Sequence, residues 1–163
     1  PRLRPTILVV DTSASCFGPV DTLVRAAALA AAHALLAAEL PAYVVAAGGE
    51  TRTWALQTRA DAVEILAERS PRAAQPKKAL ARAMGLAEVV RDGVLEPLVL
   101  VFSHPWFAAE EDTLLLPRCL RGLFVMYPRH PATPALAPRC ETWRALRSDD
   151  HEGLAEALVE LLG

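Results

Sequence analysis

Cysteine is scarce in this chain, and its placement excludes two kinds of site. Three cysteines, Cys16, Cys119 and Cys140, are too few and too scattered for a disulfide framework. No CxxC or cysteine–histidine spacing indicates zinc. A reducing, cytoplasmic location is therefore expected, with Cys119 and Cys140 as small core residues. Cys16 directly follows a polar cluster and is the better candidate for a reactive thiol.

An excess of charge of one sign is also missing. The 17 basic and 19 acidic residues give a net charge of −2 and are spread along the sequence. A nucleic-acid or membrane-surface binder carries a basic patch, so neither partner is expected. The longest predicted helix, 19–40, contains Asp21, Arg25 and Glu39, which argues against an apolar membrane span of about 20 residues. No signal peptide opens the chain, and its start at Pro1 without Met predicts a domain of a longer protein.

The sequence further lacks the short motifs of common enzyme classes. It has no G-x-S-x-G turn, no Walker-type phosphate loop and no cluster of carboxylates for two-metal nuclease chemistry. These absences favour a non-catalytic protein. One alternative is a hydrolase that uses Ser13 or Cys16 with His104, which also needs an orienting acid.

A second enzymatic alternative is an ATP-binding protein. A strand that ends in Asp11-Thr12-Ser13 resembles the start of the phosphate site in sugar kinases and actin-like ATPases. That superfamily follows this turn with a β-hairpin. Here an alanine-rich helix follows, and a second phosphate loop is missing.

Apolar residues make up 53% of the chain and fall into short runs and helical stripes. Continuous runs that end in turn residues are typical of strands buried on both faces of a sheet. They predict strands at 6–10, 42–47, 51–56, 98–102, 123–127 and 141–146. Apolar residues three and four apart, preceded by proline or capping signals, are typical of helices. They predict helices at 19–40, 58–69, 76–91, 108–120 and 151–162.

This order predicts an α/β fold: a doubly wound, Rossmann-like three-layer sandwich around a six-stranded, mostly parallel sheet. Gly48-Gly49 joins the second and third strands at hairpin distance, which predicts one antiparallel edge strand. The length suits one domain over residues 1–163. Ligands are expected where the carboxyl ends of the strands meet.

Three polar residues alternate in the turn after the first strand. Asp11, Ser13 and Ser15 offer one carboxylate and two hydroxyls, and hard oxygen ligands of this kind suit Mg²⁺ or Mn²⁺. The same residues are explained equally well as side chains that cap the first helix and satisfy backbone amides of the turn. The pattern therefore leaves a metal site and a structural turn both open.

With this D-x-S-x-S turn and this order of strands and helices, the chain resembles the von Willebrand factor A (vWA) family. In that family the turn forms part of a metal-ion-dependent adhesion site. The resemblance implies that Ser13 and Ser15 ligate a cation directly and that Asp11 acts largely through water. A carboxylate from a partner often completes the coordination sphere.

Two other loops depart from the family pattern. The family usually supplies a threonine before the helix that starts here at Pro76, where this chain has Ala74 and Gln75. After the fourth strand the family commonly has Thr-Asp-Gly, whereas this chain has Ser103-His104-Pro105. Neutral imidazole does not offset the charge of a cation. We therefore expect a degenerate site with no cofactor or a weakly held Mg²⁺ or Mn²⁺, or His104 bonded to Asp11 without metal.

These features predict a non-catalytic protein–protein interaction or scaffold module, with a Mg²⁺- or Mn²⁺-dependent vWA ligand-binding domain as the alternative. The partner is another protein, or another domain of the same protein, at the carboxyl edge of the sheet. Trp106 and Phe107 either close the crevice or anchor the partner. The residues expected to contact it are Asp11, Ser13, Ser15, Gln75, Ser103, His104 and Trp106.

Overall fold

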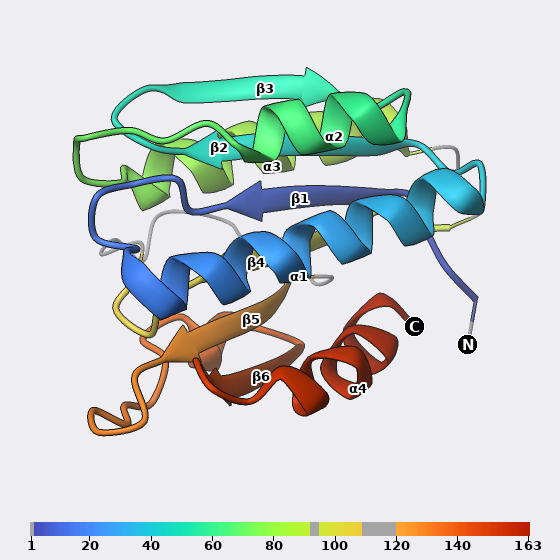
Figure 1. The fold of residues 1–163 in the computed structure, drawn as a ribbon. Coiled ribbons are helices and arrows are strands. Elements are labelled where there is room, and N and C mark those ends of the chain that lie inside the picture. Colours follow the sequence, from blue (N-terminus) through green and yellow to red (C-terminus); the bar gives the residue numbers. More distant parts are fainter. Residues whose placement is uncertain (1, 92–94, 109–119) are drawn as a thin grey trace.

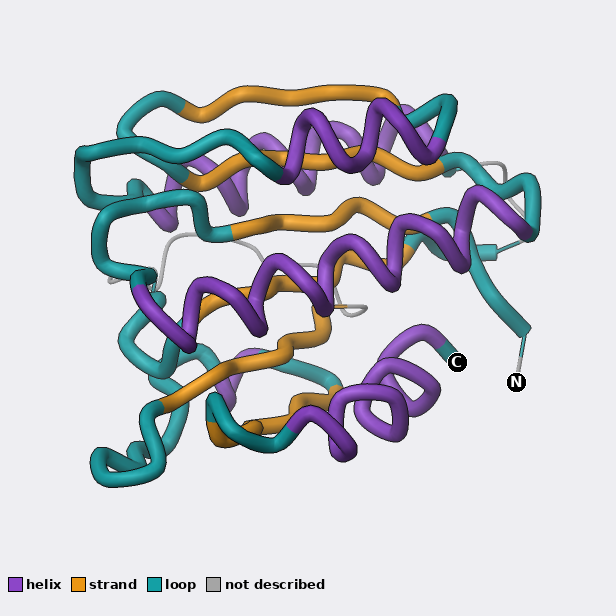
Figure 2. The backbone as a smooth tube through the Cα atoms, viewed as in Figure 1, coloured by secondary structure: helices purple, strands orange, loops and turns teal. Residues whose placement is uncertain are grey.

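The computed structural model describes residues 2–91, 95–108 and 120–163. Six strands form one sheet: β1 (Thr6–Val10), β2 (Ala42–Ala47), β3 (Thr51–Ala55), β4 (Leu98–Ser103), β5 (Leu120–Met126) and β6 (Thr142–Arg147). The helices of the described part are α1 (Gly18–Ala37), α2 (Arg59–Leu66), α3 (Pro76–Val90) and α4 (His151–Leu162), with a 3₁₀ turn at Ala137–Arg139. Strands and helices are interspersed along the chain, with β3 directly after β2 and α3 directly after α2 (Figure 2).

The strands lie in the order β3-β2-β1-β4-β5-β6. All neighbouring pairs are parallel except β2 and β3, which are antiparallel. The predicted mostly parallel sheet with one antiparallel edge strand is confirmed. Since the chain winds outward in both directions from β1 and β4, the loops that leave these two strands diverge and open a crevice at the carboxyl edge.

Helices cover both faces of the sheet (Figure 1). Leu8 and Val10 of β1 pack in one core with α1, α2 and α4, while Ile7 and Val9 point to the opposite face and pack with α3. All of β1 is buried. A strand with apolar neighbours on both faces needs no polar alternation, which explains its continuous apolar run.

Helix α1 packs closely on the sheet through alanines. Ala27, Ala28, Ala31 and Ala32 are fully buried, and their small side chains let the helix backbone approach the strands. By length and composition alone, α1 is the one helix of the described residues that is able to span a membrane, and half of its most apolar window is buried in the protein. The charged residues of α1 therefore do not make it too polar to cross a membrane. This differs from the expectation drawn from the sequence.

The end of α1 differs from the prediction. The helix stops at Ala37 rather than at Leu40, because the next residues form a Schellman-type end. The amide of Leu40 donates to the carbonyl of Leu35 at 3.1 Å, and the amide of Glu39 donates to the carbonyl of Leu36 at 3.0 Å. Glu39 takes the left-handed conformation, with φ 55°, at the position that usually holds glycine.

Strand β5 begins at Leu120, earlier than the predicted Leu123. Arg121 interrupts the apolar pattern there, yet its guanidinium is held by the carbonyl of Leu161 at 2.7 Å and by the Glu141 carboxylate at 3.3 Å. An arginine with such partners is compatible with an inner strand. The predicted helix at 108–120, and Cys119 within it, fall almost wholly outside the described residues.

Candidate functional site

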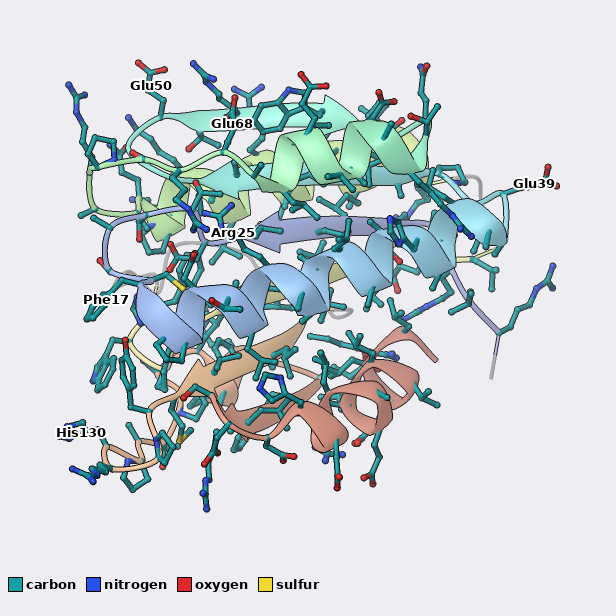
Figure 3. The ribbon with its side chains drawn as sticks, in the orientation of Figure 1. Phe17, Arg25, Glu39, Glu50, Glu68 and His130 are labelled. Carbon is teal, nitrogen blue, oxygen red and sulfur yellow. The ribbon has the colours of Figure 1, made fainter. Side chains whose placement is uncertain are left out.

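The loops that follow the parallel strands gather at one edge of the sheet. Phe17, Glu50 and His130, from the loops after β1, β2 and β5, lie at this edge, and Glu39 lies at the opposite end of the molecule (Figure 3). The amide of Asp11 donates to the carbonyl of Phe102 at 3.0 Å. This bond extends the pairing of β1 with β4 and brings Asp11 beside the residues that follow β4.

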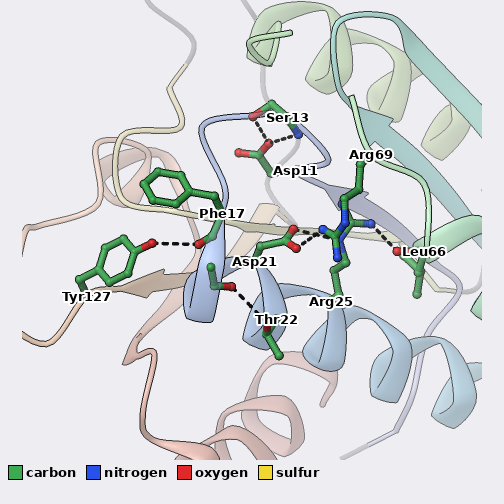
Figure 4. A network of polar contacts seen from close by, with 10 residues as sticks. Asp11, Ser13, Phe17, Asp21, Thr22, Arg25, Leu66, Arg69 and Tyr127 are labelled. Carbon is green, nitrogen blue, oxygen red and sulfur yellow. Dashed lines mark hydrogen bonds and ion pairs between the residues drawn. The ribbon is translucent and has the colours of Figure 1, made fainter. Parts of the chain in front are cut away.

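Asp11 is the centre of a closed set of hydrogen bonds. Its side chain is fully buried. Its Oδ1 atom accepts from the Ser13 amide at 2.9 Å and from the Ser13 hydroxyl at 2.5 Å (Figure 4). Its Oδ2 atom accepts from the Ser103 hydroxyl at 2.5 Å. Hydrogen bonds to an ionised carboxylate are about twice as strong as neutral ones, so these donors compensate the buried charge.

His104 completes the set as a neutral imidazole. Its Nδ1 atom accepts from the amide of Trp106 at 3.1 Å, so in the neutral ring the proton is on Nε2. Nε2 lies 3.4 Å from Asp11 Oδ2. Burial lowers the pKa of His104, and the Asp11 charge opposes this shift only in part. The bond to Trp106 also disfavours protonation, because a protonated Nδ1 is unable to accept it.

These residues do not fit a complete Mg²⁺ site. Both oxygens of Asp11 already accept hydrogen bonds, and His104 presents an N–H rather than a lone pair toward it. The side-chain amide of Gln75 donates to the backbone carbonyl of Gly49 at 3.1 Å. This side chain is therefore bound to the β2–β3 turn. Ser15 is exposed, and its hydroxyl has no bond to Asp11 in the described part. Magnesium demands an octahedral set of oxygens, which this arrangement does not supply.

Two further observations agree with that conclusion for residues 2–91, 95–108 and 120–163. They contain no group of three or more His, Cys, Asp or Glu side chains placed to hold a metal. Their buried side-chain nitrogen and oxygen atoms without a hydrogen-bond partner belong to Arg4, His33, Thr51 and Thr53, none of which belongs to the Asp11 set. Each buried side-chain polar atom of the Asp11 set therefore already has a hydrogen-bond partner, and none of them requires a cation for this purpose.

The described part of the site holds no serine or cysteine side chain that is hydrogen-bonded to His104. The hydroxyls of Ser13 and Ser103 donate to Asp11 rather than to His104, and the acceptor nitrogen of His104 is used by Trp106. Cys16 is buried, and burial together with the negative charge of Asp11 raises the pKa of its thiol far above the usual range. A serine or cysteine that uses His104 as its base needs contact with that imidazole, and an unaided thiol needs a depressed pKa. The described residues of the site show neither.

Exposed aromatic rings flank the Asp11 set. Trp106 is 62% exposed, while Phe107 is buried in the core under α3, so the two candidate aromatic residues have separate roles. Phe17 is also 62% exposed. Its ring lies 5.8 Å from that of Tyr127, whose hydroxyl donates to the Phe17 carbonyl at 2.9 Å. We call Phe17, Trp106 and Tyr127 the aromatic edge.

An ion cluster beside the turn was not foreseen from the sequence. Asp21 is buried and binds Arg25 at 2.9 Å and also Arg69, while Arg25 donates to the carbonyl of Leu66 at the end of α2 (Figure 4). The cluster fixes α1 to the end of α2. Asp21 and Arg25 are four residues apart on a helix, which signals a pair, but no sequence pattern links Arg69 to them.

The predicted loop at 70–75 does lie against the D-x-S-x-S turn. The amide of Ser70 donates to the carbonyl of Thr12 at 2.8 Å, and the amide of Ala14 donates to the carbonyl of Arg72 at 3.2 Å. Of the residues predicted to contact a partner, the structure brings Asp11, Ser13, Ser103, His104 and Trp106 together, leaves Ser15 at the surface and turns Gln75 toward Gly49.

Comparisons with known proteins place the fold. No protein-family model matches the chain, and no curated protein matches it significantly. Two solved structures of proximal thread matrix protein 1 from the mussel byssus are similar, with TM-scores of 0.56 and 0.59 and 9% identity in each. They cover 98% of this chain, which spans less than half of their length, 47% and 46%. At this identity the similarity concerns the fold alone, and it confirms the predicted doubly wound, vWA-like α/β class.

Proposed function

We propose that the chain is a non-catalytic vWA-type interaction module that binds a protein partner, or another domain of the same protein, at the carboxyl edge of its sheet without a bound metal. The observation that carries the proposal is the contrast between two sets of side chains. Asp11, Ser13, Ser103 and His104 satisfy one another below the surface, while Phe17 and Trp106 are each 62% exposed beside them.

Exposed aromatic residues suit partner binding for a physical reason. Burying a tryptophan or phenylalanine removes a large apolar area from water at little cost in side-chain entropy, and tryptophan is enriched among the residues that dominate interface energies. The loop that holds Trp106 is fixed by two backbone hydrogen bonds, and the carbonyl of Phe17 accepts a bond from Tyr127. The backbone amide of Phe107 donates to the carbonyl of His104 at 3.2 Å, and the backbone amide of Ala135 donates to the carbonyl of Pro105 at 2.7 Å. A rigid loop loses less entropy when it binds.

The solved structures with a similar fold support a non-catalytic role only weakly. Their title describes a matrix protein of the mussel byssus. One fold hosts many unrelated functions, so the main support is that, among the described residues, no serine or cysteine side chain is hydrogen-bonded to His104. The pairing of both serine hydroxyls with Asp11 is the specific feature that disfavours hydrolysis.

Affinity capture tests the proposal. The immobilised wild-type chain and the double variant Phe17→Ala/Trp106→Ala are exposed to a lysate of the source cells, each with and without EDTA, and the captured proteins are quantified by mass spectrometry. We expect a specific partner whose capture is insensitive to EDTA. Its affinity should fall at least about tenfold in the double variant, because a central aromatic residue contributes about 2 kcal/mol or more to binding.

The matched control removes two exposed apolar side chains from other surfaces. Val89 on α3 and Val159 on α4 are 79% and 70% exposed, and Val89→Ala/Val159→Ala should capture the same partner with unchanged affinity. Circular dichroism confirms that each variant is folded. Equal capture by the aromatic double variant would contradict the proposal, and loss of capture on adding EDTA would favour the metal-dependent alternative.

A further inference from the structure

A polar cavity lies beside the candidate site, between the β2–β3 turn and the loop that precedes α3. Its volume is about 450 Å³. Its charged lining residues are three arginines and two glutamates, and its lining hydroxyls belong to Ser70 and Thr12. The charged residues are Arg52, Arg69, Arg72, Glu50 and Glu68. It does not include the aromatic edge, so it is a separate feature of the same end of the molecule.

The wall of this cavity is rigid, because the β2–β3 turn approaches the 70–72 segment very closely. A Cβ atom on Gly48 would lie 2.8 Å from the Cβ of Ser70, and one on Gly49 would lie 2.6 Å from the Cβ of Arg72. Only glycine allows such an approach. The stem of Arg72 therefore lies directly on the turn, which restricts where its guanidinium can go.

Ser70 has one hydrogen-bonding group left. Its hydroxyl oxygen accepts from the amide of Gly49 at 3.0 Å and from the amide of Arg72 at 3.2 Å. A serine hydroxyl has two lone pairs and one proton. Both lone pairs are thus used, and no acceptor for the proton is found in the described part of the chain. The remaining capacity of Ser70 is that of a hydrogen-bond donor.

The charges of the cavity are unequally compensated. Arg52 pairs with Glu68 at 3.1 Å and lies 3.9 Å from Glu50, and Arg69 pairs with Asp21. Arg72 makes no ion pair with any described residue. Arg72, which is exposed, and Ser70 thus line the same cavity. No described residue accepts a hydrogen bond from the Arg72 guanidinium or from the Ser70 hydroxyl.

We infer that this cavity is an oxyanion site in which Arg72 and Ser70 bind one carboxylate or phosphate group of a small ligand. The fork of a guanidinium matches the two oxygens of such a group, and these charge-assisted bonds are among the strongest that side chains form. The hydroxyl of Ser70 donates a further bond. The site is independent of partner binding at the aromatic edge, so either proposal can fail without the other.

Ligand titration followed by NMR tests the inference. Isotopically labelled protein is titrated with inorganic phosphate and, separately, with acetate, while sodium chloride keeps the ionic strength constant. We expect saturable shifts confined to the amides of Gly49, Ser70 and Arg72. Saturation by phosphate alone assigns a phosphate ligand, and saturation by acetate assigns a carboxylate. Shifts that do not saturate, or that spread over the other arginines, would overturn the site.

Three variants sharpen the titration. Arg72→Ala should raise the apparent Kd about tenfold or more, because it removes the charged fork, and Arg72→Lys should recover only part of the affinity. Gly49→Ala should also weaken binding, because its new methyl group displaces the stem of Arg72. The matched control is Arg82→Ala, an exposed arginine on α3, which should bind like the wild type. An unchanged Kd in Arg72→Ala would reject the inference.

Discussion

A buried carboxylate such as Asp11 must be compensated, since an uncompensated charge in the interior costs many kcal/mol. Here hydroxyl and amide donors from Ser13 and Ser103 take that role, and His104 lies 3.4 Å away with its N–H facing the same oxygen. Asp11, Ser13 and Ser103 are residue types that often bind metals, but here they are hydrogen-bonded to one another. The same carboxylate suits metal binding and hydrogen bonding, because a cation and the hydrogen of an O–H or N–H group both present positive charge to it.

The protonation state of His104 makes stability depend on pH. Its pKa is lowered in the folded protein by burial, so below the usual value of about 6.5 the unfolded chain binds more protons than the folded one. The contribution of His104 to the free energy of unfolding should therefore be constant above about pH 7.5 and fall as the pH drops through 6.5. Urea unfolding at several pH values measures this slope.

Two histidine variants isolate that contribution. His104→Gln should flatten the slope between about pH 7.5 and 5.5, because no imidazole is left to protonate at that position. His130→Gln, which changes an exposed loop histidine, should leave the slope as in the wild type. A wild-type slope that persists in His104→Gln would show that another group titrates.

The sequence predicts the local part of the site and misses the contacts that join distant segments. Asp11 and Ser13 are two residues apart after a buried strand, so their contact follows from the turn itself. The bond of Gln75 to Gly49 and the ion pair of Arg69 with Asp21 join segments far apart in the chain. No periodic pattern encodes such pairs, and they depend on how α2 and its following loop pack.

At the scale of whole elements, the local sequence pattern predicts the bounds of most strands. Strands β1, β2, β3, β4 and β6 lie within one residue of their predicted bounds, although few side chains of β3 and β6 are buried. The buried strand β5 begins three residues before its predicted start, because Arg121 interrupts its apolar run. Some element ends are less well predicted, since they depend on individual backbone conformations. The end of α1 is the clearest case, because Glu39 stands at a left-handed position and gives no glycine signal.

Replacing Glu39 should stabilise the protein. A left-handed conformation costs an ordinary residue about 1–2 kcal/mol, and a glycine offsets part of that gain because it loses about 0.5–1 kcal/mol more entropy on folding. Glu39→Gly should therefore raise the free energy of unfolding by about 0.5–1 kcal/mol. Thermal or urea unfolding of Glu39→Gly, compared with the wild type, measures this change directly.

Two neighbouring substitutions control for side-chain effects at the end of α1. Glu39→Ala keeps the left-handed strain and should bring no comparable gain. Ala37→Gly places glycine in the last helical residue and should destabilise the protein by about 1 kcal/mol. A loss of stability in Glu39→Gly would mean that its carboxylate contributes more than the strain costs.

For the molecule as a whole, strand order decides which loops meet. Because β1 lies next to β4, Asp11 and His104 come together although 93 positions separate their numbers in the chain. The resemblance to the vWA family predicted that meeting, whereas composition and periodicity alone predict only that strands and helices alternate. The same strand order shows at which positions substitutions could create a cation site. Such substitutions test why the residues now present do not form one.

The double variant Gln75→Thr/His104→Asp supplies the threonine and the second carboxylate that this chain lacks relative to the family pattern. Without metal it should be less stable than the wild type, because two carboxylates at one buried site repel each other. Mg²⁺ should then raise its Tm, since a cation that binds only the folded state contributes about 2.7 kcal/mol at one hundred times its Kd, or several degrees for a chain of this size. EDTA should reverse the gain.

The wild type provides the decisive contrast in that experiment. Its single carboxylate is already satisfied by Ser13 and Ser103, so a cation would have to displace hydrogen bonds without a second negative charge to offset its own. Its Tm should therefore be the same with Mg²⁺, Mn²⁺ or EDTA, and Gln75→Thr alone should behave likewise. A wild-type Tm that rises with Mg²⁺ and saturates would show that Asp11, Ser13 and Ser15 suffice as ligands, and would overturn the metal-free interpretation of this edge.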